Sequence, residues 1–247
     1  MVKVLHSRIP PDILPDKALP GVAPLQADLW FRVDEAYAEQ MAYRRNLLRD
    51  KRQLVLEDVA PDAQESIHEV FAAALERMPS MGFQVHDSFI VCPDGVQIDR
   101  EADSPLAVLG RCLQEDICIL IKKDAEHILA AAVLCFPASW TLSEKIGRPL
   151  TTIHVPVPQY DDNIARRVQR LFDGVRVGVP LWRNNFLRYD DPDLFQPLSE
   201  NDPQRQEPPS EQEPYIRAER QIIFRLPKTQ AVVFSIHSYV VAAQSDV

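Results

Sequence analysis

The stretch that decides the fold is Y-I-R-A-E-R-Q-I-I-F-R-L-P-K-T-Q-A-V-V-F-S-I-H-S-Y-V-V, which spans residues 215–241. It contains two runs rich in β-branched and aromatic residues, Tyr215–Leu226 and Ala231–Val241. The connection between them, residues 227–230, is short and mostly polar. Two strand-length runs joined by such a turn predict an antiparallel β-hairpin.

A second hairpin is predicted upstream, because the apolar runs Ile117–Lys123 and Ile128–Phe136 flank a short polar break with His127 in the turn. Leu181–Tyr189 is predicted to be a further extended segment. About five largely antiparallel strands with flanking helices place the chain in the α+β class. Apolar spacing of three and four residues predicts helices over Asp28–Arg52, after Pro61, from Pro105, and over Asp161–Gly174.

Proline-rich segments divide the chain. Residues 1–28 hold five prolines among scattered apolar residues, so we predict an N-terminal arm that wraps the body. Residues 29–247 are predicted to form one domain, since no repeat or second core pattern is present. Within it, residues 197–214 are polar and proline-rich, which is typical of a flexible insertion or a lid.

The charge balance excludes several classes of partner. Acidic residues number 36 and basic residues 27, for a formal net charge of −9. Nucleic-acid and anionic-membrane binding both need a basic footprint, so we expect neither partner. No apolar run approaches about 18 residues, and the four cysteines show no C-x-x-C spacing. We therefore expect a cytoplasmic protein with reduced thiols.

Strand periodicity points to one unusual side chain. Period-two alternation over Tyr215–Leu226 puts Arg220 on the same face as Ala218 and Ile222, which predicts a buried guanidinium. An unpaired buried charge costs several kcal/mol, so Arg220 needs an anionic partner or several acceptors. Either a core carboxylate or a ligand carboxylate or phosphate meets that need, and the sequence leaves both open.

His154 lies in a stiff part of the chain, where Val155 and Val157 each precede a proline and are biased to extended conformations. A structural hydrogen-bonding role and a ligand role are both open to it. No His-x-His or His-x-x-x-His pair is present, so we expect no metal site built from protein side chains alone. One histidine suffices where a macrocycle supplies the other ligands of iron, as in haem. Cys135 is the other candidate haem ligand, or a core cysteine.

Four segments together resemble the alpha-subunit family of haem-dependent oxidative N-demethylases. They are D-E-x-Y-x-x-x-M-x-x-R at 34–44, F-P-A-S-W-x-x-x-E-K-I-G-R-P-L from Phe136, I-H-V-P-V-P at 153–158, and E-R-Q-x-x-x-R-L-P from Glu219. The resemblance implies a PAS-like sheet that holds haem b and removes N-methyl groups from small amines with molecular oxygen. It also implies a partner reductase that carries flavin, an iron–sulfur cluster and NADPH, because this chain has no motif for them.

The resemblance also implies roles for individual residues. His154 would be the axial ligand of the haem iron. Arg148 and Arg220 would pair with the haem propionates. Glu219 and Tyr239 would lie on the substrate side, where a carboxylate holds a protonated amine.

The chain departs from the family pattern in three places. Residues 228–230 replace a Ser-Gly turn, Phe186 replaces a tryptophan, and His237 stands where the family has an arginine or lysine. His237 is thereby the next candidate for the iron ligand. Two other readings stay open: a haem- or small-ligand-binding sensor or regulatory subunit without turnover, and a structural partner subunit that has lost its cofactor.

Overall fold

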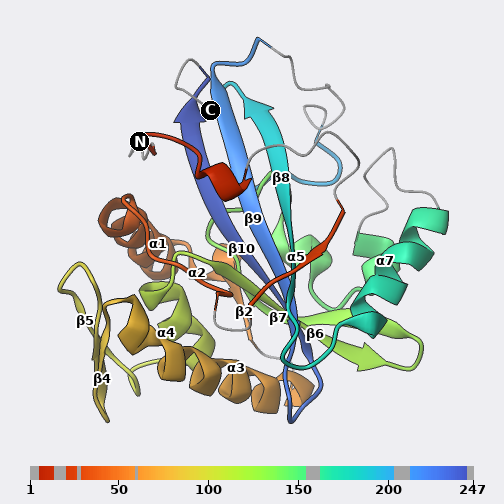
Figure 1. Ribbon diagram of the computed structural model, residues 1–247, viewed down its shortest axis with the longest axis horizontal. Coiled ribbons are helices and arrows are strands. Elements are labelled where there is room, and N and C mark those ends of the chain that lie inside the picture. Colours follow the sequence, from red (N-terminus) through yellow and green to blue (C-terminus); the bar gives the residue numbers. More distant parts are fainter. Residues whose placement is uncertain are drawn as a thin grey trace.

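A seven-stranded antiparallel sheet forms the centre of the protein, described here from a computed structural model (Figure 1). The structure describes residues 6–13, 21–26, 29–58, 61–153, 162–202 and 212–243, with only the backbone for 162–165. The strand order is β1-β8-β9-β10-β6-β7-β2. The strands are β1 (Ala23–Pro24), β2 (Leu56–Glu57), β6 (Asp116–Lys123), β7 (Glu126–Val133), β8 (Leu181–Tyr189), β9 (Tyr215–Arg225) and β10 (Val232–Ala242).

Strands β9 and β10 pair along their whole length, from Arg225 opposite Val232 to Tyr215 opposite Ala242. Strand β6 pairs with β10 only as far as Ile236. Beyond that point the N-terminal segment takes the free edge of β10, because the His6 N–H donates to the Val240 carbonyl at 2.8 Å. The beginning and the end of the described chain therefore lie side by side.

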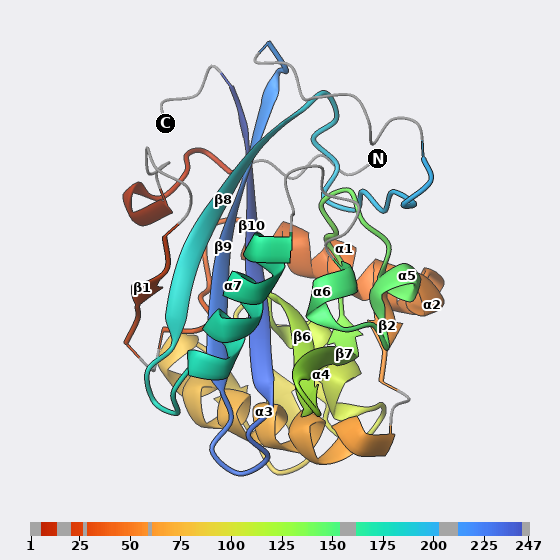
Figure 2. The same cartoon turned by 90° about the vertical axis from the view of Figure 1, so that its right-hand side faces the viewer.

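Helices cover the sheet on both faces (Figures 1 and 2). Helices α1, α3 and α4 contribute to an apolar core with one face, and α5, α6 and α7 form a second apolar cluster on the other. Because each face is covered, β9 and β10 are buried along most of their length. The helices are α1 (Tyr37–Asp50), α2 (Arg52–Val55), α3 (Gln64–Arg77), α4 (Pro105–Cys112), α5 (Leu142–Lys145), α6 (Leu150–Ile153) and α7 (Asp162–Gly174).

Smaller elements complete the fold. A three-stranded sheet combines β3 (Gln84–Val85), β4 (Phe89–Val91) and β5 (Gln97–Asp99), and 3₁₀ turns lie at Pro11–Ile13, Pro61–Ala63 and Met78–Met81. None of the helices in the described ranges is long and apolar enough to cross a membrane.

The structure confirms the α+β class, both hairpins, and the bounds predicted for Leu181–Tyr189. Helix α4 begins as predicted, with Ser104 Oγ accepting a hydrogen bond from the Ala107 N–H at 3.4 Å. The PAS-like character of the sheet, the division of the chain at residue 28 and the flexibility of residues 197–214 stay predictions. Residues 14–20, 27–28 and 203–211 lie outside the described chain.

Two local predictions were wrong. The first helix starts at Tyr37 and not at Asp28, because Asp34 forms a turn in which its side chain accepts the Ala36 N–H at 2.9 Å. Trp30 precedes that turn and enters the core from irregular chain. His127 lies in strand β7 and is buried, whereas we predicted it in the turn.

Candidate functional site

Strand β9 has charged residues on both of its faces. Alternation places Arg217, Glu219 and Gln221 on the same face as Ile223, which packs in the cluster formed with α5, α6 and α7. We call this the α7 side. Arg220 lies on the opposite face, toward the N-terminal segment and α1, and we call this the α1 side. Buried charges need partners, so the contacts on each side show which groups remain unpaired.

On the α7 side, Arg217 is almost fully paired. Its guanidinium donates to the carbonyls of Phe136, Leu194 at 3.1 Å and Pro137 at 3.4 Å. Arg217 Nε also lies 3.3 Å from Glu219 Oε1 in an ion pair. Arg217 therefore ties β9 to the segment that follows β7.

Arg183 lies beside this pair and is much less satisfied. It stands opposite Gln221 in the β8–β9 register, and its Nε has no hydrogen-bond partner in the described chain. Burial lowers the pKa of Arg183, and Glu219 only partly offsets that effect. Glu219 Oε2 itself accepts a hydrogen bond from Gln221 Nε2 at 2.9 Å. The α7 side thus offers one incompletely paired cation next to one carboxylate.

Arg148 lies between α5 and α6 on the α7 side. Its Nη1 is 3.2 Å from Glu200 Oε2, and its side chain is 45% exposed. Lys145 Nζ binds the same carboxylate at 2.5 Å. Ile153 ends α6 and packs against the apolar cluster of the α7 side. His154 is the next residue, and it lies outside the described residues together with 155–161.

On the α1 side, Arg220 is 2% exposed and poorly partnered. It donates to the Leu29 carbonyl at 2.5 Å, its Nη1 has no hydrogen-bond partner, and no described carboxylate oxygen lies within 4.0 Å of it. Burial, together with the neighbouring Arg32 cation, lowers the pKa of Arg220 from 12.5 to about 10. The sequence left two partners open for Arg220, a core carboxylate and a ligand anion. Among the described residues, no core carboxylate contacts it.

A buried network of acids and histidines lies on the same side. Asp34 Oδ2 is 2.9 Å from His6 Nε2 and 2.9 Å from His237 Nε2. His237 Nδ1 lies 2.8 Å from Glu115 Oε1. Burial opposes ionisation of Asp34, but the hydrogen bonds from His237 and His6 hold its pKa well below the ordinary range. The hydroxyl of Tyr239 accepts a hydrogen bond from Arg32 Nη1 at 3.3 Å at the edge of this network.

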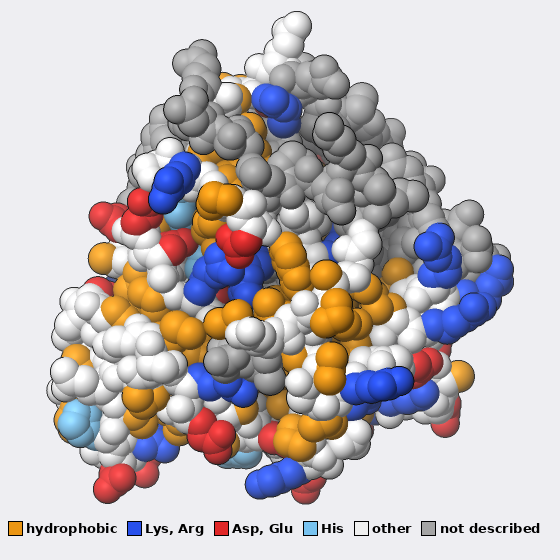
Figure 3. All heavy atoms as spheres, in the orientation of Figure 1, with side chains coloured by type: hydrophobic (Ala, Val, Ile, Leu, Met, Phe, Trp, Pro, Cys, Tyr) orange, Lys and Arg blue, Asp and Glu red, His pale blue; other side chains and the backbone are white. Residues whose placement is uncertain are grey.

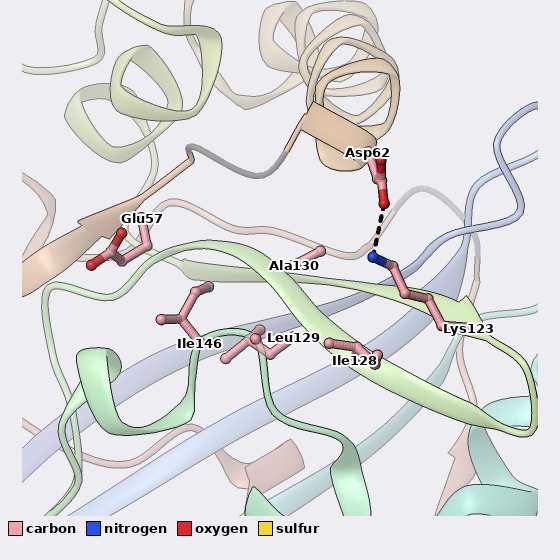
Figure 4. A pocket seen from close by; sticks show the side chains of 8 residues that line it. Glu57, Asp62, Lys123, Ile128, Leu129, Ala130 and Ile146 are labelled. Carbon is pink, nitrogen blue, oxygen red and sulfur yellow. Dashed lines mark ion pairs between the residues drawn. The ribbon is translucent and has the colours of Figure 1, made fainter.

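The described residues line two cavities, one of them beside the network. A cavity of about 180 Å³ opens beside the network and is lined by His6, Arg8, Pro10, Pro11, Asp34, Glu35 and Tyr239. A second, of about 310 Å³, lies at the edge of β7 (Figure 4). Its wall is mainly apolar, with the Asp62–Lys123 ion pair at 2.8 Å on one side.

The structure brings together some of the predicted site residues and separates others. Arg220 and Tyr239 share the α1 side with His237, whereas Glu219 and Arg148 lie on the α7 side. The two arginines expected at the propionates are thus on opposite faces of the sheet. Four residues of the two sites were not predicted from the sequence, because they lie far apart in it: His6, Asp34, Glu115 and Arg183. Among them, only Asp34 is a fixed position of one of the motifs quoted above.

The described chain is thus an α+β protein with incompletely paired arginines on both faces of its central sheet. Residues 21–245 match the family model described as haem-dependent oxidative N-demethylase, alpha subunit-like, and the chain belongs to that family. This match confirms the resemblance in the sequence and covers nearly the whole chain.

Proposed function

We propose that this chain is the haem-binding subunit of a multicomponent oxygenase that removes an N-methyl group from a small amine. Family membership supports the haem-dependent oxidative chemistry. The observation that carries the placement of the site is Arg183 on the α7 side. This side chain is partly buried, its buried Nε lacks a hydrogen-bond partner in the described chain, and it stands beside Glu219. A buried cation of this kind is stabilised when an anionic ligand binds.

The residues on the α7 side fit haem. Haem b carries two carboxylates and an iron that needs an axial ligand. Arg183 and the partly exposed Arg148 supply cations on this side. His154 follows directly after Ile153, which packs on the same face, and we propose His154 as the ligand. Arg220 lies on the other face, so this placement of haem does not use it, and the haem-retention test in the Discussion decides between this placement and the propionate pairing that the resemblance implies.

In this site the protein binds and orients the amine. Bound haem would supply the oxygen chemistry that oxidises the N-methyl group, which leaves as formaldehyde. Glu219 accepts the N–H of a protonated amine, since a carboxylate in a buried setting favours a cationic ligand. Gln221 Nε2 and Arg217 Nε hold the two oxygens of Glu219 in place, at 2.9 and 3.3 Å. Their contacts fix the direction in which the carboxylate receives the amine.

The electrons come from a partner protein. Helix α7 bears Arg166, Arg167 and Arg170 on its exposed side, and Figure 3 shows basic side chains gathered over this helix. In a chain with a net charge of −9, such a basic face favours an acidic partner surface. We propose that the reductase docks here, close to the connection between α6 and α7.

The test begins with the visible spectrum of protein expressed with an adequate haem supply. We expect a Soret band that His154→Ala removes and that His68→Ala, a change at an exposed histidine of α3, leaves intact. Amine-dependent formaldehyde release with a supplied reductase is then expected for the wild type and strongly reduced for Glu219→Gln. Absence of haem from the wild-type protein would refute the proposal. Haem binding without turnover on any small methylated amine would favour a sensor.

A further inference from the structure

We infer that His6, Asp34 and His237 form a binding site for a divalent transition-metal ion. Their ligand atoms all lie within 4.8 Å of one another on the α1 side of the sheet. Two imidazole nitrogens and one carboxylate oxygen are the donor set that zinc and non-haem iron take in sites with open coordination positions. The site lies on the opposite face from the proposed haem site and does not depend on it.

The distances suit a common ion. Asp34 Oδ2 lies 2.9 Å from the Nε2 atoms of both His6 and His237. Ligands that bind one ion at about 2.0–2.2 Å, at right angles to each other, lie about 3 Å apart. The two histidine nitrogens lie within 4.8 Å of each other, so small movements of their side chains bring all three atoms to one ion.

The second oxygen of Asp34 is held so that Oδ2 is left for the ion. Oδ1 accepts hydrogen bonds from Gln114 Nε2 at 2.8 Å and from the Ala36 N–H at 2.9 Å. These two donors fix the plane of the carboxylate. A ligating carboxylate that is oriented through its other oxygen is a recurrent feature of metal centres.

His237 is oriented in the way that metal-binding histidines usually are. Its Nδ1 donates to Glu115 Oε1 at 2.8 Å, and this pair stays intact when an ion displaces the proton on Nε2, which donates to Asp34 in the arrangement described. Glu115 Oε1 also accepts the Arg32 N–H at 2.9 Å, which holds the carboxylate in place. The proposed haem chemistry does not use this pair of Glu115 and His237.

His6 contributes the third ligand at a small cost. In the arrangement described, His6 Nδ1 accepts a long hydrogen bond from the Val240 N–H at 3.3 Å, so Nε2 carries the proton and donates to Asp34. When an ion binds Nε2, this single ring proton moves to Nδ1, and the hydrogen bond from the Val240 N–H is lost. The His6 N–H still donates to the Val240 carbonyl at 2.8 Å and keeps the residue in position.

Room for further ligands exists on the open side. The cavity of about 180 Å³ is lined by His6 and Asp34 themselves and by Tyr239. At about 30 Å³ per molecule it has space for several waters. Water molecules can therefore complete the coordination of the ion from this side.

The experiment is equilibrium dialysis of the full-length protein against buffered Zn²⁺, with bound zinc measured by mass spectrometry. The protein is first freed of metal with a chelator that leaves haem in place. We expect one Zn²⁺ per chain in the wild type and no stoichiometric binding in His6→Gln or Asp34→Asn. Glu115→Gln, which keeps the size of the side chain but removes the carboxylate that orients His237, should weaken binding by about 10- to 100-fold. The control His68→Gln should bind as the wild type does.

Melting curves with and without Zn²⁺ guard against variants that fail to fold. The wild type and His68→Gln should melt at a higher temperature when Zn²⁺ is present, because an ion that binds only the folded state stabilises it. Folded His6→Gln and Asp34→Asn should show no such rise. The inference is overturned if the wild type binds no Zn²⁺, or if these two variants bind it with wild-type affinity.

Discussion

Replacing Arg220 by methionine tests whether a buried cation weakens this fold. The drop in the pKa of Arg220 from 12.5 to about 10 corresponds to about 3 kcal/mol that the charged side chain costs the folded state. Within the described chain Arg220 donates a hydrogen bond to the Leu29 carbonyl, and leaving that acceptor unpaired costs about 1–3 kcal/mol. We therefore expect Arg220→Met to leave the free energy of unfolding unchanged or to raise it by up to about 2 kcal/mol.

Arg217→Met is the matched control on the same strand. Arg217 is as deeply buried as Arg220, but it is paired with Glu219 and donates to three backbone carbonyls. Its removal leaves the Glu219 carboxylate buried without that partner, which costs about 3–5 kcal/mol. In a chain of this size 1 kcal/mol shifts the melting temperature by about 2–4 °C. Arg217→Met should thus melt about 6–20 °C lower, and Arg220→Met between 0 and about 8 °C higher.

The assay is thermal unfolding of both variants and the wild type, each with and without haem. If Arg220→Met without haem melts as low as Arg217→Met, Arg220 has an anionic partner in the protein and the reasoning from its burial is refuted. Haem retention by Arg220→Met tests whether Arg220 pairs with a haem propionate. We expect Arg220→Met to keep haem, because Arg220 lies on the α1 side. Loss of haem from a variant that is stable without it would show that Arg220 pairs with a propionate, as the resemblance implies.

Two further changes test the packing. Burial lowers the pKa of His127 below its ordinary 6.5, so the unfolded chain takes up the proton first as the pH falls. The free energy of unfolding should therefore rise with pH through the window below about pH 6.5. His127→Phe, which cannot be protonated but loses the hydrogen bond to Gln169, should lose this slope in melting curves recorded across that window. Gly110→Ala should lower the free energy of unfolding by about 1–3 kcal/mol in chemical denaturation, because the new Cβ would lie 2.5 Å from Val133 Cγ2 and 3.1 Å from Leu48 Cδ1. A denaturation midpoint equal to that of the wild type would show that α4 can move away from the sheet.

Much of the fold could be predicted because its signals are local. The hairpins are marked by β-branched runs and short turns, and the start of α4 by Ser104 followed by a proline. The start of α1 could not be read in the same way, since Trp30 and Val33 keep helical spacing with Tyr37 although they lie in irregular chain. There the turn at Asp34, stabilised by its own side chain, outweighs the periodicity.

The candidate site was only partly predictable. Period-two alternation correctly placed Arg220 and Glu219 on opposite faces of β9 and Arg220 in the interior. Alternation says nothing about partners that come from distant segments. His6, Asp34 and His237 meet only after the sheet forms, so spacing rules for metal ligands within one segment could not find them.

The docking of the N-terminal segment on β10 has a consequence for synthesis. His6 and the buried Ile13 leave the ribosome well over 200 residues before Val240 and Tyr239, beside which they pack. At about 5–20 residues per second, roughly 10–50 s separate the two events. During that time the apolar residues of the N-terminal segment stay exposed, because the strand against which they pack has not yet been made. Molecular chaperones engage growing polypeptides that expose such residues.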